Sequence, residues 1–434
     1  MKKSILSSFL IPLVLGVFLL IACNDTEDIS LSSDAHDEEI SDGPITSFNV
    51  DDLRSMKSKL EGRGIDVSDI DLAEQDEAQT RGVLFENPFV NAIKVTTRSL
   101  HPNRSGQYID VSGVLLVPRK TSRTKQKNFR IIVVPPSTYT YNNSAPSIAF
   151  QRMSLLNDES TLNYLYFWTL QAQSGFVVFM PDYPGYGDSY KQCFHPYMDA
   201  EALVNSTLDL LKSAQRTLTD NGYQYKKELV ISGYSQGAFV SASLAREIET
   251  NPAHNLDVSL LFIGGSPCNL KYIADEVRRS DYTSHTYLVP FALWGYKENA
   301  YPHMKVSDIL KEPYASGSKS YYDGTHKELN KEFSHNPSEV YTEKFLKYMD
   351  QDPDMLYIND ILDKNSVKPW VNKCDFVMTH GVDDETVYYQ NAKDFAEKQK
   401  EIGGKVKFYS TWGEHTPGFI PYYIRASAYL PFYR

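Results

Sequence analysis

Short apolar runs that alternate with helical patterns constrain the fold of this chain more than any other feature of its sequence. Four such runs each end at a turn signal: Ile131 to Val134, Phe176 to Met180, Leu229 to Ser232 and Val258 to Gly264. Continuous apolar runs of this length are typical of strands buried on both faces of a parallel sheet. Helical patterns lie between them, over residues 162–173, 200–218 and 238–248. This order predicts right-handed crossovers and a doubly wound, mostly parallel α/β sheet.

A hairpin pattern precedes the alternation, and one long segment interrupts it. Residues 90–98 and 108–117 alternate apolar and polar side chains, which predicts two antiparallel strands joined by a turn. Between about residues 269 and 369, helical stretches and aromatic residues replace the alternation. It resumes with strands over 376–379 and 406–412 and helices over 387–402 and 419–430. We therefore predict one domain over residues 83–434 with an inserted helical cap, placed where open α/β sheets bind ligands.

The sequence Gly233-Tyr234-Ser235-Gln236-Gly237 lies between a predicted strand and a predicted helix. In this setting a GxSxG sequence forms a sharp turn that raises a nucleophilic serine above the sheet. We assign Ser235 as the nucleophile, and the flanking elements argue against a chance glycine-serine turn. The backbone N–H of Gln236, in the first turn of the helix, is the expected first oxyanion donor, aided by the positive end of the helix dipole.

A serine hydroxyl needs an adjacent base at neutral pH, normally a histidine that a carboxylate holds in one tautomer. In hydrolases whose nucleophile lies on such a turn, the catalytic groups follow along the chain in the order serine, acid, histidine. His415 lies just after the last predicted strand and is the only histidine beyond the candidate acids, so it is the predicted base. The acid is one of Asp383, Asp384 and Glu385, which follow the strand predicted at 376–379.

With these motifs the chain resembles the secretory-lipase branch of the α/β-hydrolase superfamily over residues 83–434. The resemblance rests on the GYSQG turn, on the order of the catalytic groups, and on the segments 111–118, 181–187, 195–197 and 380–384. The HGxxDxxV pattern of related hydrolases falls on residues 380–387 and assigns Asp384 as the acid, with Asp383 and Glu385 solvated. Members of this branch cleave carboxylic esters, often acylglycerols, and use a helical cap to shape the acyl site.

The chain departs from that branch at the second oxyanion donor. Many members carry His-Gly-Thr after the third strand, whereas this chain has Pro135-Pro136-Ser137-Thr138. Because proline has no N–H, the second donor would come from Ser137 or Thr138, and both stay candidates.

Three residues beside these motifs are candidate substrate contacts: Tyr234 in the serine turn, and Asp182 and Tyr186 in the loop after the fourth strand. Loops rich in proline and glycine are usually structural, and that interpretation stays open for Asp182 and Tyr186. We expect His380 to support the acid-bearing turn and His195 to pack ahead of its helix.

Residues 1–22 have the pattern of an export signal. Lys2 and Lys3 precede an apolar run that ends in Leu20-Ile21-Ala22-Cys23. This ending resembles the lipobox of bacterial lipoproteins, in which Cys23 would be acylated and become the mature N-terminus. A transmembrane anchor is the alternative, because the apolar length is close to the lower limit for a span.

Residues 23–82 are predicted to form an acidic tether and then an appendage with a short helical pattern after residue 46. Acids directly behind a lipid-bearing cysteine resemble the signal that sends lipoproteins to the cell surface in some Gram-negative lineages, and a plain solvated spacer explains them equally well. We predict an exported lipoprotein at the outer membrane or cell surface of a Gram-negative bacterium. Its lipid would be its only contact with the membrane.

The net charge of −11 argues against a nucleic-acid partner, which needs clustered lysines and arginines. The cysteines after Cys23 are Cys193, Cys268 and Cys374, an odd number that implies no disulfide framework. No spacing of cysteines and histidines is typical of a metal site, so we predict a mechanism without a metal or a cofactor. The sequence leaves the oligomeric state open.

These features predict a serine hydrolase that cleaves carboxylic esters of lipids, glycans or other small molecules through an acyl-enzyme. Two alternatives stay open. A peptidase of the prolyl-oligopeptidase type uses the same order of catalytic groups, but it normally carries a β-propeller, and the sequence shows no blade-like repeat. A surface lipoprotein that binds a ligand without catalysis would keep the fold, but it would not need a complete triad.

Overall fold

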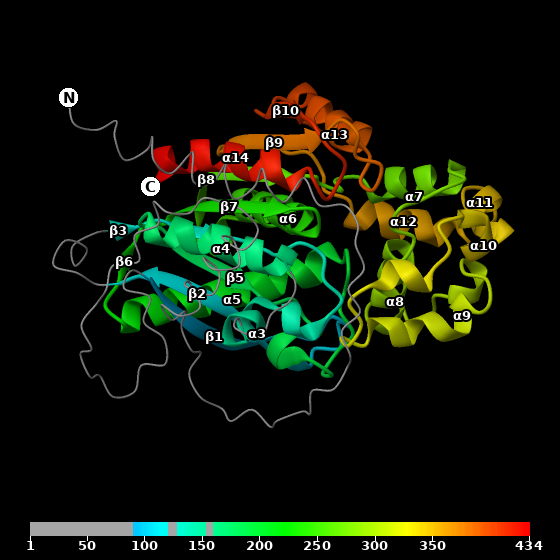
Figure 1. Ribbon diagram of the computed structural model, residues 1–434, viewed down its shortest axis with the longest axis horizontal. Coiled ribbons are helices and arrows are strands. Elements are labelled where there is room, and N and C mark those ends of the chain that lie inside the picture. The colour runs from blue at the N-terminus through cyan, green and yellow to red at the C-terminus, as the bar shows by residue number, and fades with distance from the viewer. Residues whose placement is uncertain (1–89, 120–127, 153–158) are drawn as a thin grey trace, which may run out of the picture.

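An eight-stranded mixed sheet forms the centre of the molecule in the computed structural model, which describes residues 90–119, 128–152 and 159–434 (Figure 1). Its strands are β1 (Val90–Leu100), β2 (Tyr108–Pro118), β4 (Ile131–Val133), β5 (Val177–Pro181), β7 (Glu228–Tyr234), β8 (Asp257–Gly264), β9 (Asp375–Gly381) and β10 (Lys407–Thr411). The order across the sheet is β1-β2-β5-β4-β7-β8-β9-β10. β2 pairs antiparallel with β1 and β5, and the other pairs are parallel, which confirms the predicted fold class.

Helices cover both faces of the sheet, because successive side chains of a buried strand point to opposite faces. Val133 and Ile231 belong to the apolar cluster on one face, whereas their neighbours Ile132 and Val230 belong to the cluster on the other. The first face is covered by α5 (Ala200–Asp220), α6 (Gln236–Thr250) and α13 (Tyr389–Glu401). The second face is covered by α3 (Pro146–Gln151), α4 (Glu159–Gln173) and α14 (Phe419–Tyr429).

Helix α5 illustrates how local sequence sets an element. Its first N–H groups need an acceptor, and the Asp199 side chain accepts from the Ala202 N–H at 3.2 Å. Its buried face repeats at helical spacing and includes Leu203, Thr207, Leu210, Leu211 and Ala214. The helix ends before Gly222, whose φ of 68° suits a glycine.

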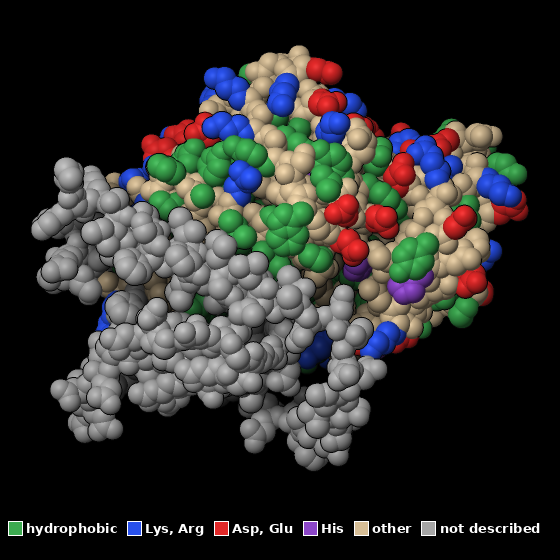
Figure 2. Space-filling view, turned by 45° about the horizontal axis from the view of Figure 1, so that its top comes forward, with side chains coloured by type: hydrophobic (Ala, Val, Ile, Leu, Met, Phe, Trp, Pro, Cys, Tyr) green, Lys and Arg blue, Asp and Glu red, His purple; other side chains and the backbone are tan. Residues whose placement is uncertain are grey.

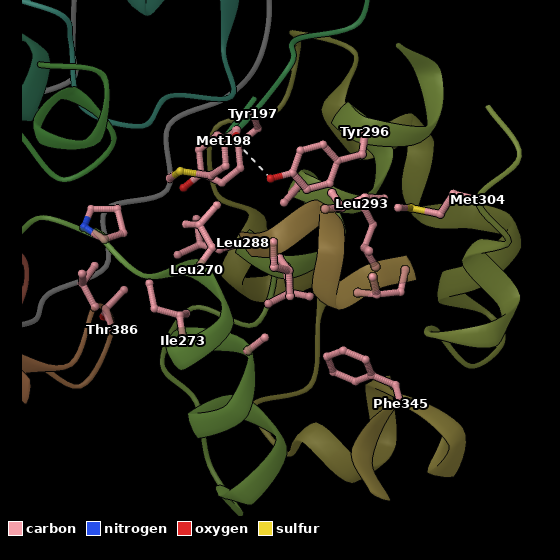
Figure 3. Close-up of a pocket in the computed structure, with 18 of the residues that line it drawn as sticks. Tyr197, Met198, Leu270, Ile273, Leu288, Leu293, Tyr296, Met304, Phe345 and Thr386 are labelled. Atoms are coloured by element: carbon pink, nitrogen blue, oxygen red, sulfur yellow. Dashed lines mark hydrogen bonds between the residues drawn. The ribbon is translucent and has the colours of Figure 1, made fainter. Parts of the chain in front are cut away.

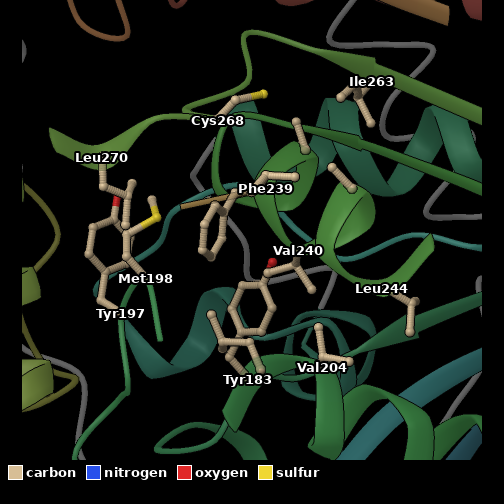
Figure 4. Packing of buried hydrophobic residues seen from close by; sticks show 14 of the residues in the cluster. Tyr183, Tyr197, Met198, Val204, Phe239, Val240, Leu244, Ile263, Cys268 and Leu270 are labelled. Atoms are coloured by element: carbon tan, nitrogen blue, oxygen red, sulfur yellow. The ribbon is translucent and has the colours of Figure 1, made fainter. Parts of the chain in front are cut away.

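The apolar cluster on the first face continues beyond the sheet. Phe239 and Val240 of α6 and Ile263 of β8 belong to this cluster, which also reaches Met198 ahead of α5 and Leu270 (Figure 4). Leu270 belongs to the segment between β8 and β9, so this segment shares its core with the main domain.

The segment between β8 and β9, hereafter the cap, lies beyond the carboxyl ends of the parallel strands (Figure 1). It is built from helices and turns: α7 (Leu270–Arg279), α8 (Leu288–Glu298), α9 (Tyr314–Gly317), α10 (Pro337–Val340), α11 (Glu343–Tyr348) and α12 (Leu356–Asn365), with 3-10 turns at Val306–Asp308, Ser318–Tyr322 and Leu329–Glu332. At its start, Asn269 and Asn391 of α13 exchange two hydrogen bonds of 3.1 and 2.7 Å. The predicted insertion therefore forms a helical cap docked on the main domain.

The structure adds small elements that the sequence patterns did not predict. Strands β3 (Asn128–Phe129) and β6 (Gln224–Tyr225) form a separate parallel pair, and they are too short to leave a periodic signal. Helix α6 also begins two residues before the predicted start, at Gln236. The three cysteines of the described residues are free thiols.

The predicted export signal, Cys23, the acidic tether and the appendage lie outside the described residues. Within the described residues, no helix combines the length and the apolar character that crossing a membrane requires. On the face drawn in Figure 2, acidic and basic side chains are intermingled.

Candidate active site

Ser235 forms the turn between β7 and α6 with a φ of 56° and a ψ of −122°, a conformation that side-chain-bearing residues seldom adopt. Neighbouring glycines make this turn sterically possible. A Cβ on Gly233 would lie 2.3 Å from the carbonyl oxygen of Gly237, and a Cβ on Gly237 would lie 2.3 Å from that of Pro135. The Ser235 N–H donates to the Gly264 carbonyl of β8 at 3.0 Å, which anchors the turn to the sheet.

The three predicted catalytic residues meet in one hydrogen-bonded series. The Nε2 atom of His415 lies 2.8 Å from Ser235 Oγ, and its Nδ1 atom lies 2.7 Å from Asp384 Oδ2. A carboxylate can only accept, so Nδ1 carries the proton and Nε2 is left to accept from the serine hydroxyl. Asp383 and Glu385 are exposed and take no part in this series.

The Asp384 side chain is buried and held from several directions. Its Oδ1 atom accepts from the backbone N–H groups of Thr386 and Val387 at 3.0 and 2.9 Å. Nε2 of His380 lies 3.2 Å from Oδ2, which fits the supporting position expected for this histidine. Burial opposes ionisation, but the charge of His415 and the contacts with His380 and His415 outweigh it and hold the pKa of Asp384 well below its usual range.

The predicted oxyanion donors lie around the start of α6. The first N–H groups of a helix have no intrahelical acceptor, and Gln236 is the first residue of α6. Across from it, the Ser137 hydroxyl donates to the Tyr234 carbonyl at 3.1 Å, and Thr138 Oγ1 lies 3.1 Å from the Tyr197 hydroxyl. Both hydroxyls are therefore engaged, whereas neither backbone N–H of Ser137 and Thr138 has an acceptor among the described residues. Which of these two N–H groups is the second donor stays a prediction.

The Gln236 side chain is buried and bonded to His195. His195 Nδ1 lies 2.9 Å from the Pro184 carbonyl and must donate to it, so Nε2 accepts from the Gln236 amide at 2.9 Å. Burial lowers the pKa of His195 to about 3, against the opposing effect of its bond to Pro184. His195 is thus a neutral packing residue, as expected, and it also fixes the side chain that follows the nucleophile.

Tyr234, Asp182 and Tyr186 do not lie on the wall of the cavity beside Ser235, contrary to their assignment as substrate contacts. Asp182 is buried and accepts from the Ser112 hydroxyl and the Ser147 N–H, and the Tyr186 hydroxyl donates to the Tyr139 carbonyl. These bonds tie loops together, so the structural interpretation of the loop applies. The Tyr234 hydroxyl donates to the His415 carbonyl at 2.7 Å and supports the loop that carries the base.

An apolar cavity of about 820 Å³, part of it open to solvent, runs from Ser235 into the cap. Figure 3 shows Thr386 at one end of the lining side chains and Met304 toward the opposite end. The lining comes mainly from α7, α8, α11 and α12, and includes Leu270, Ile273, Ala274, Leu288, Ala292, Leu293, Phe345, Ile358 and Ile361. The one hydrogen bond drawn there joins the Tyr296 hydroxyl to the Met198 carbonyl at 3.0 Å.

Sequence patterns did not identify the residues of this lining. Leu270, Ile273 and Ala274 stand at helical spacing, which predicts a buried face but not whether that face meets side chains or empty space. Thr386 and His285 were also missed, since a lone threonine or a lone histidine in a loop carries no signal of its own.

A model of the secretory lipase family matches residues 154–417. The chain belongs to the secretory lipase family. Membership identifies this secretory lipase as a carboxylic ester hydrolase and confirms the resemblance drawn from its motifs. The family also indicates an exported protein. No curated protein matches the chain in sequence.

Several solved structures share the fold of this secretory lipase. A ligand-bound form of the rice cell wall degrading esterase LipA from Xanthomonas oryzae has a TM-score of 0.69 at 18% identity, over 91% of this chain and 98% of that one. A putative hydrolase from Legionella pneumophila has a TM-score of 0.68 at 19% identity, over 79% and 89%. Candida antarctica lipase A has a TM-score of 0.57 at 14% identity, over 78% of both chains. At these identities the likeness extends to the fold alone.

The acid assignment predicts a sharp difference between neighbouring residues. Asp384→Asn removes the charge that fixes His415 and should lower kcat by roughly 10⁴-fold, the cost of this change in other serine triads. The matched control is Asp383→Asn, which should keep wild-type activity because that side chain is exposed. Steady-state hydrolysis of a p-nitrophenyl ester measures both. The opposite pattern, with Asp383→Asn inactive, would overturn the assignment.

Burial of neutral His195 predicts a pH-dependent stability. In the unfolded chain a histidine binds a proton below about pH 6.5, whereas in the folded protein His195 binds one only near pH 3. Between these pH values protons bind the unfolded state preferentially, so the free energy of unfolding falls as the pH drops from about 6.5 toward 3. From pH 8 to pH 5, the free energy of unfolding of His195→Gln should fall by about 2 kcal/mol less than that of the wild type. Chemical denaturation at both pH values measures the difference. His303→Gln, at an exposed cap histidine, should lose as much stability as the wild type.

Proposed function

We propose that this ester hydrolase cleaves esters of apolar acyl groups of medium or long chain length, through an acyl-enzyme on Ser235. One observation carries the proposal: the series Asp384, His415 and Ser235 ends at the mouth of an apolar cavity that Ser235 itself helps to line. A nucleophile with its base already in line, next to a long apolar site, suits an ester whose acyl chain enters the cavity.

In the acylation half of the reaction, Ser235 Oγ attacks the ester carbonyl carbon as its proton moves to His415 Nε2. The carbonyl oxygen becomes an oxyanion that accepts from the Gln236 N–H and from the N–H of Ser137 or Thr138. When the bond from carbon to the alcohol oxygen breaks, the alcohol takes the proton from Nε2 and leaves. The acyl group is then bonded to Ser235.

In the deacylation half, a water molecule gives one proton to His415 Nε2 and attacks the acyl carbon. The second oxyanion collapses, the free acid leaves, and Nε2 returns its proton to Ser235 Oγ. Asp384 stays ionised in both halves and stabilises the imidazolium each time it forms, because its pKa is held well below the usual range.

The cavity lining supports an apolar acyl chain as the substrate group. Each methylene that leaves water gains about 0.8 kcal/mol, so a chain that fills the cavity gains affinity with length. The Tyr296 hydroxyl already donates to the Met198 carbonyl, so it is not free to bind a polar group on the acyl chain. The alcohol would stay on the solvent side of Ser235, where a lipid or a glycan fits without a matching cavity.

We also propose that the protein is anchored by a lipid on Cys23, at the outer membrane or cell surface. The lipobox-like ending of the apolar run and the export indicated by the family support this placement.

Blocking the cavity should change the chain-length preference without disabling the triad. Ala292→Trp places a large side chain among the cavity residues of α8. We expect kcat/KM for p-nitrophenyl decanoate to fall at least about tenfold, the loss of roughly two buried methylenes, with hydrolysis of p-nitrophenyl acetate retained.

Two controls accompany this measurement. Ala253→Trp, at an exposed turn remote from the cavity, should retain the wild-type preference. Ser235→Ala should lose turnover and labelling by a fluorophosphonate probe while keeping its thermal midpoint. An unlabelled wild type would favour a binding protein without catalysis, and an unchanged preference in Ala292→Trp would place the acyl chain elsewhere.

Lipidation predicts that the full-length chain, expressed in a Gram-negative host, incorporates an alkyne-labelled fatty acid. Cys23→Ala should abolish the label because the acylated sulfur is gone, whereas Cys193→Ala should retain it. In-gel fluorescence after coupling to an azide dye measures the incorporation. Equal labelling of the wild type and Cys23→Ala would contradict the anchor.

A further inference from the structure

Two cap residues contact the loop that carries Asp384. Ser284 and His285 lie in the segment between α7 and α8, and Thr386 lies two residues after Asp384. His285 Nδ1 is 2.9 Å from Thr386 Oγ1, Ser284 Oγ is 3.1 Å from the same oxygen, and Ser284 Oγ is 2.9 Å from His285 Nδ1. These three groups lie within hydrogen-bond distance of one another and join the cap to the acid-bearing loop.

From Thr386 the contacts lead directly into the triad. The Thr386 N–H donates to Asp384 Oδ1 at 3.0 Å, and Asp384 Oδ2 accepts from His415. Thr386 also lines the acyl cavity together with Ser235. One residue therefore touches the cap, the acid and the cavity.

The cap segment that carries Ser284 and His285 is braced on both sides. Thr283 and His335 exchange two hydrogen bonds of 2.9 Å each, from the Thr283 N–H to the His335 carbonyl and between His335 Nδ1 and the Thr283 carbonyl. The buried Tyr341 hydroxyl donates to the Thr286 carbonyl at 3.0 Å. These bonds hold the backbone of the segment that presents Ser284 and His285 to Thr386.

Electrostatics keep His285 compatible with catalysis. Burial first, and then the charge of His415, lower the pKa of His285 to about 4, with Asp384 acting in the opposite direction. His285 is therefore neutral at neutral pH, and it adds no positive charge beside the imidazolium that His415 becomes during the reaction.

We propose that His285 is a positioning residue which the cap contributes to the active site: it holds Thr386, and through Thr386 the carboxylate of Asp384. The proposal rests on the proposed function, because it concerns the same triad. Its consequence is that the triad is fully ordered only when the cap is docked. The cap then acts on the chemical step as well as on the choice of acyl chain.

The test is a double-mutant cycle on kcat with p-nitrophenyl butyrate. His285→Phe keeps a ring but removes Nδ1, and Thr386→Val removes Oγ1 but keeps the backbone N–H and the side-chain size. Each should lower kcat about tenfold with little change in KM, the effect expected of one hydrogen bond. The double variant should be no slower than Thr386→Val alone, because that variant already removes the atom that His285 contacts.

Two further variants separate positioning from general packing. His285→Asn puts a polar atom near the position of Nδ1 and should recover most of kcat. His303→Phe, at an exposed histidine of the same cap, should match the wild type. If His285→Phe fails to fold, Thr386→Val and His285→Asn still carry the comparison.

Three results would overturn the proposal: a wild-type kcat in both single variants, a change confined to KM, or a double variant about a hundredfold slower, as independent effects would give. A failure of the proposed function is distinguishable from these results. In that case the wild type itself would neither hydrolyse the ester nor react with a fluorophosphonate.

Discussion

The left-handed backbone of Ser235 is the constraint around which the rest of the site is arranged. It exists because Gly233 and Gly237 have no Cβ, so that β7 and α6 can approach each other and the Pro135 carbonyl. The turn places the serine above the carboxyl edge of the sheet. Parallel strands all end at this edge, so the loops after β9 and β10 bring Asp384 and His415 to the same place, although Ser235 and His415 are 180 residues apart in the chain.

Burial and local contacts determine the charge state of each ionisable group near the active site. It lowers the pKa of His195 to about 3 and that of His285 to about 4, so both histidines act as neutral hydrogen-bonding groups. Asp384 is buried as well, but the charge of His415 and the contacts with His380 and His415 hold its pKa well below the usual range, so it stays ionised. One fixed negative charge beside His415 is what a triad needs to stabilise the imidazolium.

The cap connects substrate choice with the chemistry in this structure. Its helices supply most of the cavity lining, and the segment before α8 contacts Thr386 next to the acid. The reciprocal bonds between Asn269 and Asn391 and the apolar cluster shared with the main domain hold the cap in the position where both contacts exist. An insertion of helices can therefore act on a triad whose three members all belong to the main domain.

The sequence by itself determined the strands of the main sheet and the long helices between them, the turn at Ser235 and the choice of His415, because these follow from local periodicity, glycine placement and chain order. The same patterns placed the cap between β8 and β9. Only the tertiary structure decided which side chains face the cavity: Asp182 and Tyr186 turn to loop contacts, while Leu270 and Ile273 line the cavity. It also decided that His285 meets Thr386, since two loops 101 residues apart leave no local trace of their contact. Spacing fixes which residues share an element, but the direction of a side chain depends on the partners that packing brings to it.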